Sequence, residues 1–155
     1  MTLPLSQETK ESRGFTMRIM AIDYGDAHTG IAISDPTGFL AGFTTTINAY
    51  RPEVVAEQIA ALAKEHGVEE LVLGHPINMD GTRGPRSEKA QAMKVLLEDT
   101  TSLPVVLWDE RRTTIDAHQI LMGSGKNAKK RKKVVDAVAA SLILEGYLTY
   151  KKSHP

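Results

Sequence analysis

The feature that most constrains the fold is a continuous apolar run from Ile19 to Asp23, because such a run is typical of a central strand buried on both faces. Further strands are predicted over residues 30–34, 42–47, 70–73 and 104–110. Helices are predicted over residues 52–66, about 88–98, a short stretch after Thr113, and about 131–148. This order predicts an α/β fold with a five-stranded mixed sheet, in which a three-strand antiparallel meander precedes parallel strands, and with helices on both faces.

The length of 155 residues fits one domain, expected over residues 17–150 between a flexible N-terminal tail (1–16) and a C-terminal tail (151–155). Apolar residues make up 41 % and charged residues 25 %, so a packed core is expected. The absence of cysteine excludes disulfides and thiolate zinc sites. The polar start of the chain and the lack of a long apolar segment predict a cytoplasmic protein with no membrane partner.

The net charge is zero, but the basic residues are unevenly distributed. Six of the eight residues from Lys126 to Lys133 are basic, and no acid lies among them. Such a run predicts either a surface that meets phosphate or the solvated start of a helix. Aromatic residues make up only 5 % of the chain, which argues against a single-strand binder built on base stacking.

Two acids stand where strands end. Asp23 follows four apolar residues, and a carboxylate at the end of a buried strand is costly unless it is paired or binds a cation. Glu110 ends the fifth predicted strand, where alternation puts it on the face of Trp108 and puts Asp109 on the other face. The structural alternatives are that Asp23 caps the following turn and that Glu110 forms a salt bridge with Arg111 or Arg112.

Asp136 lies on the small apolar face of the last predicted helix, in line with Ala139, Ala140 and Ile143. The alternative is an acid favoured by the helix dipole near the helix start. The first and fifth strands are parallel, so their ends share one sheet edge, which the last helix can reach. Three converging carboxylates repel one another, and two Mg²⁺ or Mn²⁺ ions roughly 3.5–4 Å apart would relieve this and could activate water against a phosphodiester.

Four motifs resemble, in order and at similar spacing, those of the YqgF family. They are AIDYG with GIAIS, LVLGHPINMDG, WDERRTT and VVDAVAASLIL, and together they cover Met17 to Leu148. Members of that family are described as Holliday-junction resolvase-like nucleases and as nucleases that process the 5′ end of pre-16S rRNA. The resemblance implies a ribonuclease H-like fold and a hydrolase acting on ester bonds.

The resemblance also assigns site residues. Asp23, Glu110 and Asp136 match the positions that the family uses for metal binding and catalysis. Gly74, Pro76, Asn78, Asp80 and Gly81 match its central loop, which borders the sheet edge and helps to seat substrate. The residues expected to contact substrate are Gly25, His28, Asn78, Arg111, Arg112, Lys126, Lys129, Lys130 and Arg131. Where the family often has Lys or Arg in the first loop, this chain has Asp26, Ala27 and His28, so only His28 could carry positive charge there.

Several functions are compatible with these patterns. RNA is favoured over a four-way DNA junction, because a junction resolvase makes paired cuts as a dimer and no strong apolar dimerisation stripe is visible; a monomer or weak dimer is expected. A ribosomal precursor particle is a candidate partner. A non-catalytic RNA- or ribosome-binding module is a further alternative. An actin-like or sugar-kinase-like phosphotransferase needs a second domain, for which 155 residues leave no room.

Overall fold

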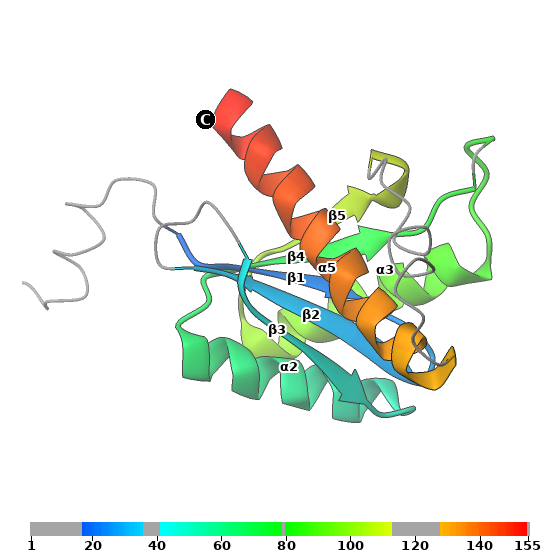
Figure 1. The fold of residues 1–155 in the computed structure, drawn as a ribbon, viewed down its shortest axis with the longest axis horizontal. Helices are drawn as coiled ribbons and strands as arrows, with labels where there is room; N and C mark the ends of the chain where they lie inside the picture. The colour runs from blue at the N-terminus through cyan, green and yellow to red at the C-terminus, as the bar shows by residue number, and fades with distance from the viewer. Residues whose placement is uncertain (1–16, 36–40, 79, 113–127, 155) are drawn as a thin grey trace, which may run out of the picture.

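The computed structural model describes residues 17–35, 41–78, 80–112 and 128–154. Its elements in chain order are β1 (Ile19–Asp23), β2 (His28–Ser34), β3 (Ala41–Asn48), α2 (Pro52–His66), β4 (Glu70–His75), α3 (Pro85–Thr101), β5 (Val105–Asp109), the short 3₁₀ helix η1 (Glu110–Arg112) and α5 (Ala128–Ser153). The strands form one sheet in the order β3-β2-β1-β4-β5 (Figure 1).

The topology confirms the predicted mixed sheet. β1 pairs with β2 and β2 with β3 in antiparallel fashion, whereas β4 lies parallel to β1 and β5 lies parallel to β4. β1 is therefore the middle strand, and its first four residues are buried, as its unbroken apolar run predicts. The carboxyl ends of β1, β4 and β5 consequently meet at one edge of the sheet (Figure 1).

One face of the sheet is covered by α2 and α3. Their buried residues pack with Met20, Ile22 and Leu73 in the larger hydrophobic cluster. α2 begins with Pro52 and ends at Gly67, whose φ of 66° is the left-handed conformation that favours glycine. These boundaries are those that the sequence predicts.

The opposite face is covered by α5, which lies across the sheet in Figure 1. Ala140, Ile143 and Leu144 of this helix are buried against the alternate residues of β1, including Ile19 and Ala21. Side chains along β1 thus alternate between the two layers, so Asp23 belongs to the face that α5 covers.

Several predicted boundaries were wrong by a few residues. α3 begins at Pro85 rather than near Glu88, because proline is well tolerated in the first turn of a helix. β4 continues past Leu73 to His75, because Gly74 and His75 pair with β5. β5 ends at Asp109, so that Glu110 opens η1 instead of ending the strand. The short helix predicted after Thr113 lies outside the described residues.

The last helix is longer than predicted at both ends. It starts at Ala128 and continues to Ser153, so residues 151–153, expected in a C-terminal tail, are helical. The C-terminal extension is stabilised where the Tyr150 ring lies 5.7 Å from the Trp108 ring and where Lys151 Nζ lies 3.3 Å from Glu70 Oε1 at the start of β4. None of the helices in the described part of the chain is long and apolar enough to cross a bilayer.

Candidate active site

Asp23 is the last residue of β1 and is partly exposed at the sheet edge. The β1–β4 register pairs Ile22 with Leu73, so one residue further Asp23 lies beside Gly74. Neighbouring strands are about 4.8 Å apart, which sets the separation of these two backbones. The backbone of Asp23 is therefore next to that of Gly74 at the carboxyl end of the two strands.

The Glu110 carboxylate lies directly over Gly74. A Cβ atom at position 74 would be 2.5 Å from Glu110 Oε1 and 2.8 Å from Ile143 Cδ1 of α5. Glu110 therefore occupies the face that α5 covers, where Trp108 also lies, and this confirms the predicted alternation at the end of β5. The missing side chain of Gly74 provides the room for the acid.

The alternative for Glu110 was a salt bridge with Arg111 or Arg112. The first of these was wrong, because Arg111 pairs with Asp109, and the Arg112 side chain is not described. Arg111 Nη2 donates to Asp109 Oδ2 at 2.7 Å, and Nε lies 3.1 Å from each of the two carboxylate oxygens. Within the part of the chain that the structure describes, Glu110 has no hydrogen bond or ion pair. Its carboxylate thus remains available for a cation.

Asp136 lies in the third turn of α5, and its side chain is outside the described part of the structure. Its backbone precedes Ala140 by one turn and Ile143 by about two, which puts it on the stripe of the helix that faces the sheet. In Figure 1 α5 begins at the end of the sheet toward which β1, β4 and β5 point. That position 136 meets Asp23 and Glu110 at this edge stays a prediction.

The donors at this edge suit a hard divalent cation. Asp23 and Glu110 offer carboxylate oxygens from one face of the sheet, and Gly74, with no side chain, lets the Glu110 carboxylate lie against the end of β4. The side chains that the structure describes include no group of three His, Asp or Glu residues able to hold a metal ion. Since Asp136 is not among those side chains, a site made of all three acids stays a prediction.

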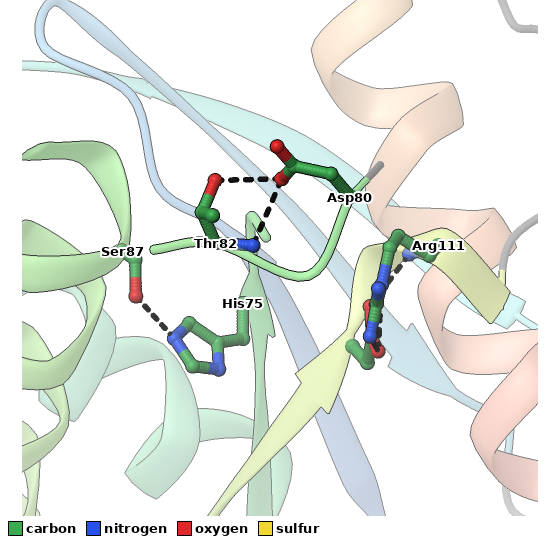
Figure 2. Close-up of polar contacts among 6 residues, drawn as sticks. His75, Asp80, Thr82, Ser87 and Arg111 are labelled. Atoms are coloured by element: carbon green, nitrogen blue, oxygen red, sulfur yellow. Dashed lines mark hydrogen bonds and ion pairs between the residues drawn. The ribbon is translucent and has the colours of Figure 1, made fainter. Parts of the chain in front are cut away.

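The central loop after β4 is folded on itself and borders Arg111. Asp80 Oδ1 accepts hydrogen bonds from the Thr82 backbone N–H at 2.9 Å and from its hydroxyl at 2.6 Å (Figure 2). Asn78 Nδ2 donates to Thr82 Oγ1 at 2.9 Å. The pKa of Arg111 is raised, mainly by its hydrogen bond to Asp109 and further by the negative charge of Asp80. The loop and η1 thus lie together beside the acids.

The other predicted substrate contacts fall into two groups. Gly25 and His28 line a cavity beside β1, and His28 Nδ1 lies 2.6 Å from Asn48 Oδ1. Arg112 ends η1, while Lys129, Lys130 and Arg131 belong to the first turns of α5, and none of these four side chains is described. Lys126 lies outside the described residues. Substrate contact by all of these residues stays a prediction.

His75 is a buried site residue that sequence patterns did not single out. Its Nε2 lies 2.6 Å from the hydroxyl of Ser87 on α3 (Figure 2). Ser87 in turn accepts a hydrogen bond from Gln91 Nε2 at 3.1 Å. Burial, followed by the charge of Arg83, lowers the pKa of His75 below 6.5. A neutral ring that accepts the Ser87 proton fits this arrangement. His75 therefore ties the end of β4 to α3, underneath the acidic edge.

We expect His75 to make the stability of the protein pH-dependent. Because its pKa is lowered in the folded state, the unfolded chain binds more protons between that pKa and 6.5. The free energy of unfolding should therefore be fully retained above pH 6.5 and should fall at lower pH, by at most about 1.4 kcal/mol per pH unit. Urea unfolding of the wild type and His75→Gln between pH 7.5 and 5.5 measures this. An equally steep loss in both proteins would contradict the assignment.

Sequence reasoning missed two further features of this region. Gly74 was assigned only to the central loop, and its role as the seat of Glu110 requires the parallel pairing of β4 and β5. Arg86 and Lys89 on α3 line the cavity beside β1, although they are distant from that loop in sequence. Their spacing of three residues just after Pro85 was the available signal, because such residues share a helix face.

A sheet with this strand order, acids at the carboxyl edge and a closing helix defines a ribonuclease H-like protein. Residues 17–150 match the RuvX family, described as Holliday junction resolvase, and this chain belongs to that family, which is the YqgF family named above. A protein from Halothermothrix orenii named "Putative pre-16S rRNA nuclease" is 45 % identical over 135 residues, which are 87 % of this chain and 96 % of that protein. A Bacillus subtilis protein of the same name is 42 % identical over 134 residues, 85 % of this chain and 97 % of that one.

Solved structures support the fold. T. thermophilus RuvC in complex with Holliday junction substrate superposes with a TM-score of 0.59 at 14 % identity, covering 87 % of this chain and 96 % of that chain. The large terminase nuclease from thermophilic phage G20c superposes with a TM-score of 0.52 at 12 % identity, covering 83 % of this chain and 80 % of that chain. The predicted ribonuclease H-like fold is thereby confirmed.

Proposed function

We propose that this protein is a metal-dependent nuclease that hydrolyses phosphodiester bonds and processes the 5′ end of pre-16S rRNA. The observation that carries the proposal is the Glu110 carboxylate, seated over Gly74 next to the end of β1. Two acids distant in sequence thus lie at one sheet edge, on the face toward the helix that contains Asp136. The names of relatives at 45 % and 42 % identity support pre-rRNA as the substrate.

Asp23, Glu110 and Asp136 would together hold Mg²⁺ or Mn²⁺, with two ions expected. Divalent cations bound there supply electrostatic stabilisation for the charge that develops on the phosphate and for the attacking water. Gly74 gives the Glu110 carboxylate its place, since a Cβ atom there would collide with Glu110 Oε1. Asp109 fixes the Arg111 guanidinium beside the central loop, where its remaining donors can orient a non-bridging phosphate oxygen.

A Holliday-junction resolvase is the second candidate, and the description of the RuvX family favours it. Junction resolution requires two symmetric cuts and so two sites, whereas a monomer or weak dimer suffices for trimming a single RNA strand. A non-catalytic RNA- or ribosome-binding module would leave the acids without a chemical role. A cytoplasmic location and a ribosomal precursor particle as partner remain predictions that follow from rRNA processing.

One cleavage experiment separates these candidates. The full-length protein is incubated with a labelled pre-16S rRNA leader and with a four-way DNA junction, in Mg²⁺, in Mn²⁺ and in chelator. We expect cleavage of the RNA only, dependent on metal and absent in chelator. Symmetric cutting of the junction alone would select the resolvase. Tight binding of RNA without cleavage under any metal condition would select the non-catalytic module and would refute the proposed nuclease.

A further inference from the structure

A surface cavity of about 290 Å³ opens beside the candidate active site. It is lined by the loop between β1 and β2 and by the first turns of α3, through Tyr24, Gly25, Asp26, Ala27, His28, Arg86 and Lys89. A water molecule takes about 30 Å³ in the liquid, so this cavity is large enough for a phosphate group with bound water. The loop begins directly after Asp23, and two extended residues span at most about 7 Å. The cavity thus adjoins the acidic edge.

The charges around this cavity are predominantly positive. Arg86 and Lys89 are both exposed and lie three residues apart on α3, so they project from neighbouring positions of one helix face. Lys89 Nζ lies 2.8 Å from Asp26 Oδ1. The pKa of Asp26 is lowered, first by its hydrogen bond and charge interaction with Lys89 and further by Arg86, which puts both cations near this carboxylate. One positive charge remains after Asp26 is neutralised.

The Lys89–Asp26 pair is well suited to exchange partners. The two side chains are 56 % and 79 % exposed, and ion pairs that exposed to water contribute little to stability. The pair therefore holds the ammonium group at the cavity without locking it there. An incoming phosphate, with more negative charge and more acceptor oxygens than the carboxylate, can take the place of Asp26.

The loop itself leaves space for a ligand. A Cβ atom on Gly25 would collide with the carbonyl oxygen of His28, so the backbone turns back on itself more tightly than a side chain permits. Ala27 adds only a methyl group. The loop lacks Lys and Arg, and α3 supplies the positive charge that the sequence of the loop does not.

We propose that this cavity binds a backbone phosphate of the nucleic-acid strand that flanks the scissile bond, with Arg86 and Lys89 as the phosphate ligands. This inference rests on the proposed nuclease function. A strand that crosses the sheet edge from the α5 side toward the α3 side meets Asp23 and Glu110 first and this cavity next. Arg86 and Lys89 position the strand without reading its bases.

Binding measurements on the full-length protein test this inference. Fluorescence anisotropy of a labelled RNA hairpin with a 5′ single-stranded extension is followed in chelator, between about 50 and 200 mM salt. The Arg86→Gln/Lys89→Gln double variant should bind about tenfold or more weakly. Its slope of log K against log salt should fall by about 0.7, since each phosphate neutralised on a single strand contributes about that much and the cavity binds one phosphate. Lys94→Gln, on the same helix but paired with Glu98, is the matched control and should bind like the wild type.

Three outcomes of these measurements support or overturn phosphate binding at this cavity. An unchanged RNA affinity and salt slope in the double variant would overturn the inference. Binding of inorganic phosphate to both proteins is measured separately. If the double variant lost phosphate binding but bound RNA like the wild type, the inference would also be overturned, because the cavity would then serve a small anion. Weaker RNA binding with a reduced slope supports it. Cleavage by Asp23→Asn, assayed in parallel, reports on the proposed function separately: its persistence would refute the nuclease site without affecting the binding result.

Discussion

Asp23→Asn should reduce metal-dependent cleavage of the RNA leader at least about a hundredfold. Loss of a residue that only supports a metal ligand already costs about 10–100-fold in activity, and we expect a direct ligand to cost more. Asparagine keeps the shape of the side chain but removes the charge that a divalent cation requires. Because Asp23 is partly exposed at the strand end, the substitution should leave the fold intact. Single-turnover cleavage in Mg²⁺ and in Mn²⁺ is the measurement.

The matched control for Asp23→Asn is Asp99→Asn, which makes the same chemical change at an exposed position near the end of α3. The control should cleave like the wild type. Equal cleavage by Asp23→Asn and the control would mean that the acid at the end of β1 has only a local role, such as capping the turn. Circular dichroism and urea unfolding of each variant exclude loss of the fold as the reason for lost activity.

Glu110→Gln and Asp136→Asn extend the same experiment to the other two acids. If the three carboxylates act as one metal-binding unit, each single substitution should cost nearly as much as all three together. Additive losses would indicate that the acids act separately. The Asp136 variant is the most informative of the three, because the side chain of this residue lies outside the described part of the structure.

Gly74→Ala should have the second largest effect, although position 74 carries no side chain that could take part in chemistry. The added Cβ would lie 2.5 Å from Glu110 Oε1 and 2.8 Å from Ile143 Cδ1, closer than atoms in contact can approach. The Glu110 carboxylate is the end of a flexible side chain and would move first. A displacement of about 1 Å at a catalytic site can cost about a hundredfold in rate. We therefore expect a loss of cleavage approaching that of Glu110→Gln.

The effect on stability should be smaller than the effect on cleavage. Ile143 is buried, so it must also shift, and overpacking of this kind costs about 1–3 kcal/mol in the free energy of unfolding. Gly84→Ala, before α3, is the matched control, since its Cβ would find its nearest neighbour at 3.8 Å, an ordinary contact. Urea unfolding and single-turnover cleavage are compared for both variants. Normal cleavage by Gly74→Ala would show that Glu110 does not need its place over this glycine.

The order of elements was predictable from the sequence because each strand and helix carries its own local signal. The unbroken apolar run of residues 19–23 predicted the middle strand, and Pro52 and Gly67 predicted both ends of α2. Errors arose where pairing or packing outweighed that signal. Gly74 looks like the start of a loop, but pairing with β5 keeps it in β4. The last helix extends beyond Leu148 because Tyr150 and Lys151 contact Trp108 and Glu70 of the sheet.

The candidate site likewise combines features that the sequence predicts with contacts that the sequence does not indicate. The amino-acid sequence was enough to predict the middle strand, the mixed sheet and the sheet edge at which positions 23 and 110 lie, because strand periodicity and the order of strands and helices specify these features. Three contacts became visible only in the folded chain: Glu110 lies over Gly74, Arg111 pairs with Asp109, and α3 brings Arg86 and Lys89 to the loop after Asp23. These contacts join segments that are distant in sequence or turn on side-chain direction, and no local pattern specifies either.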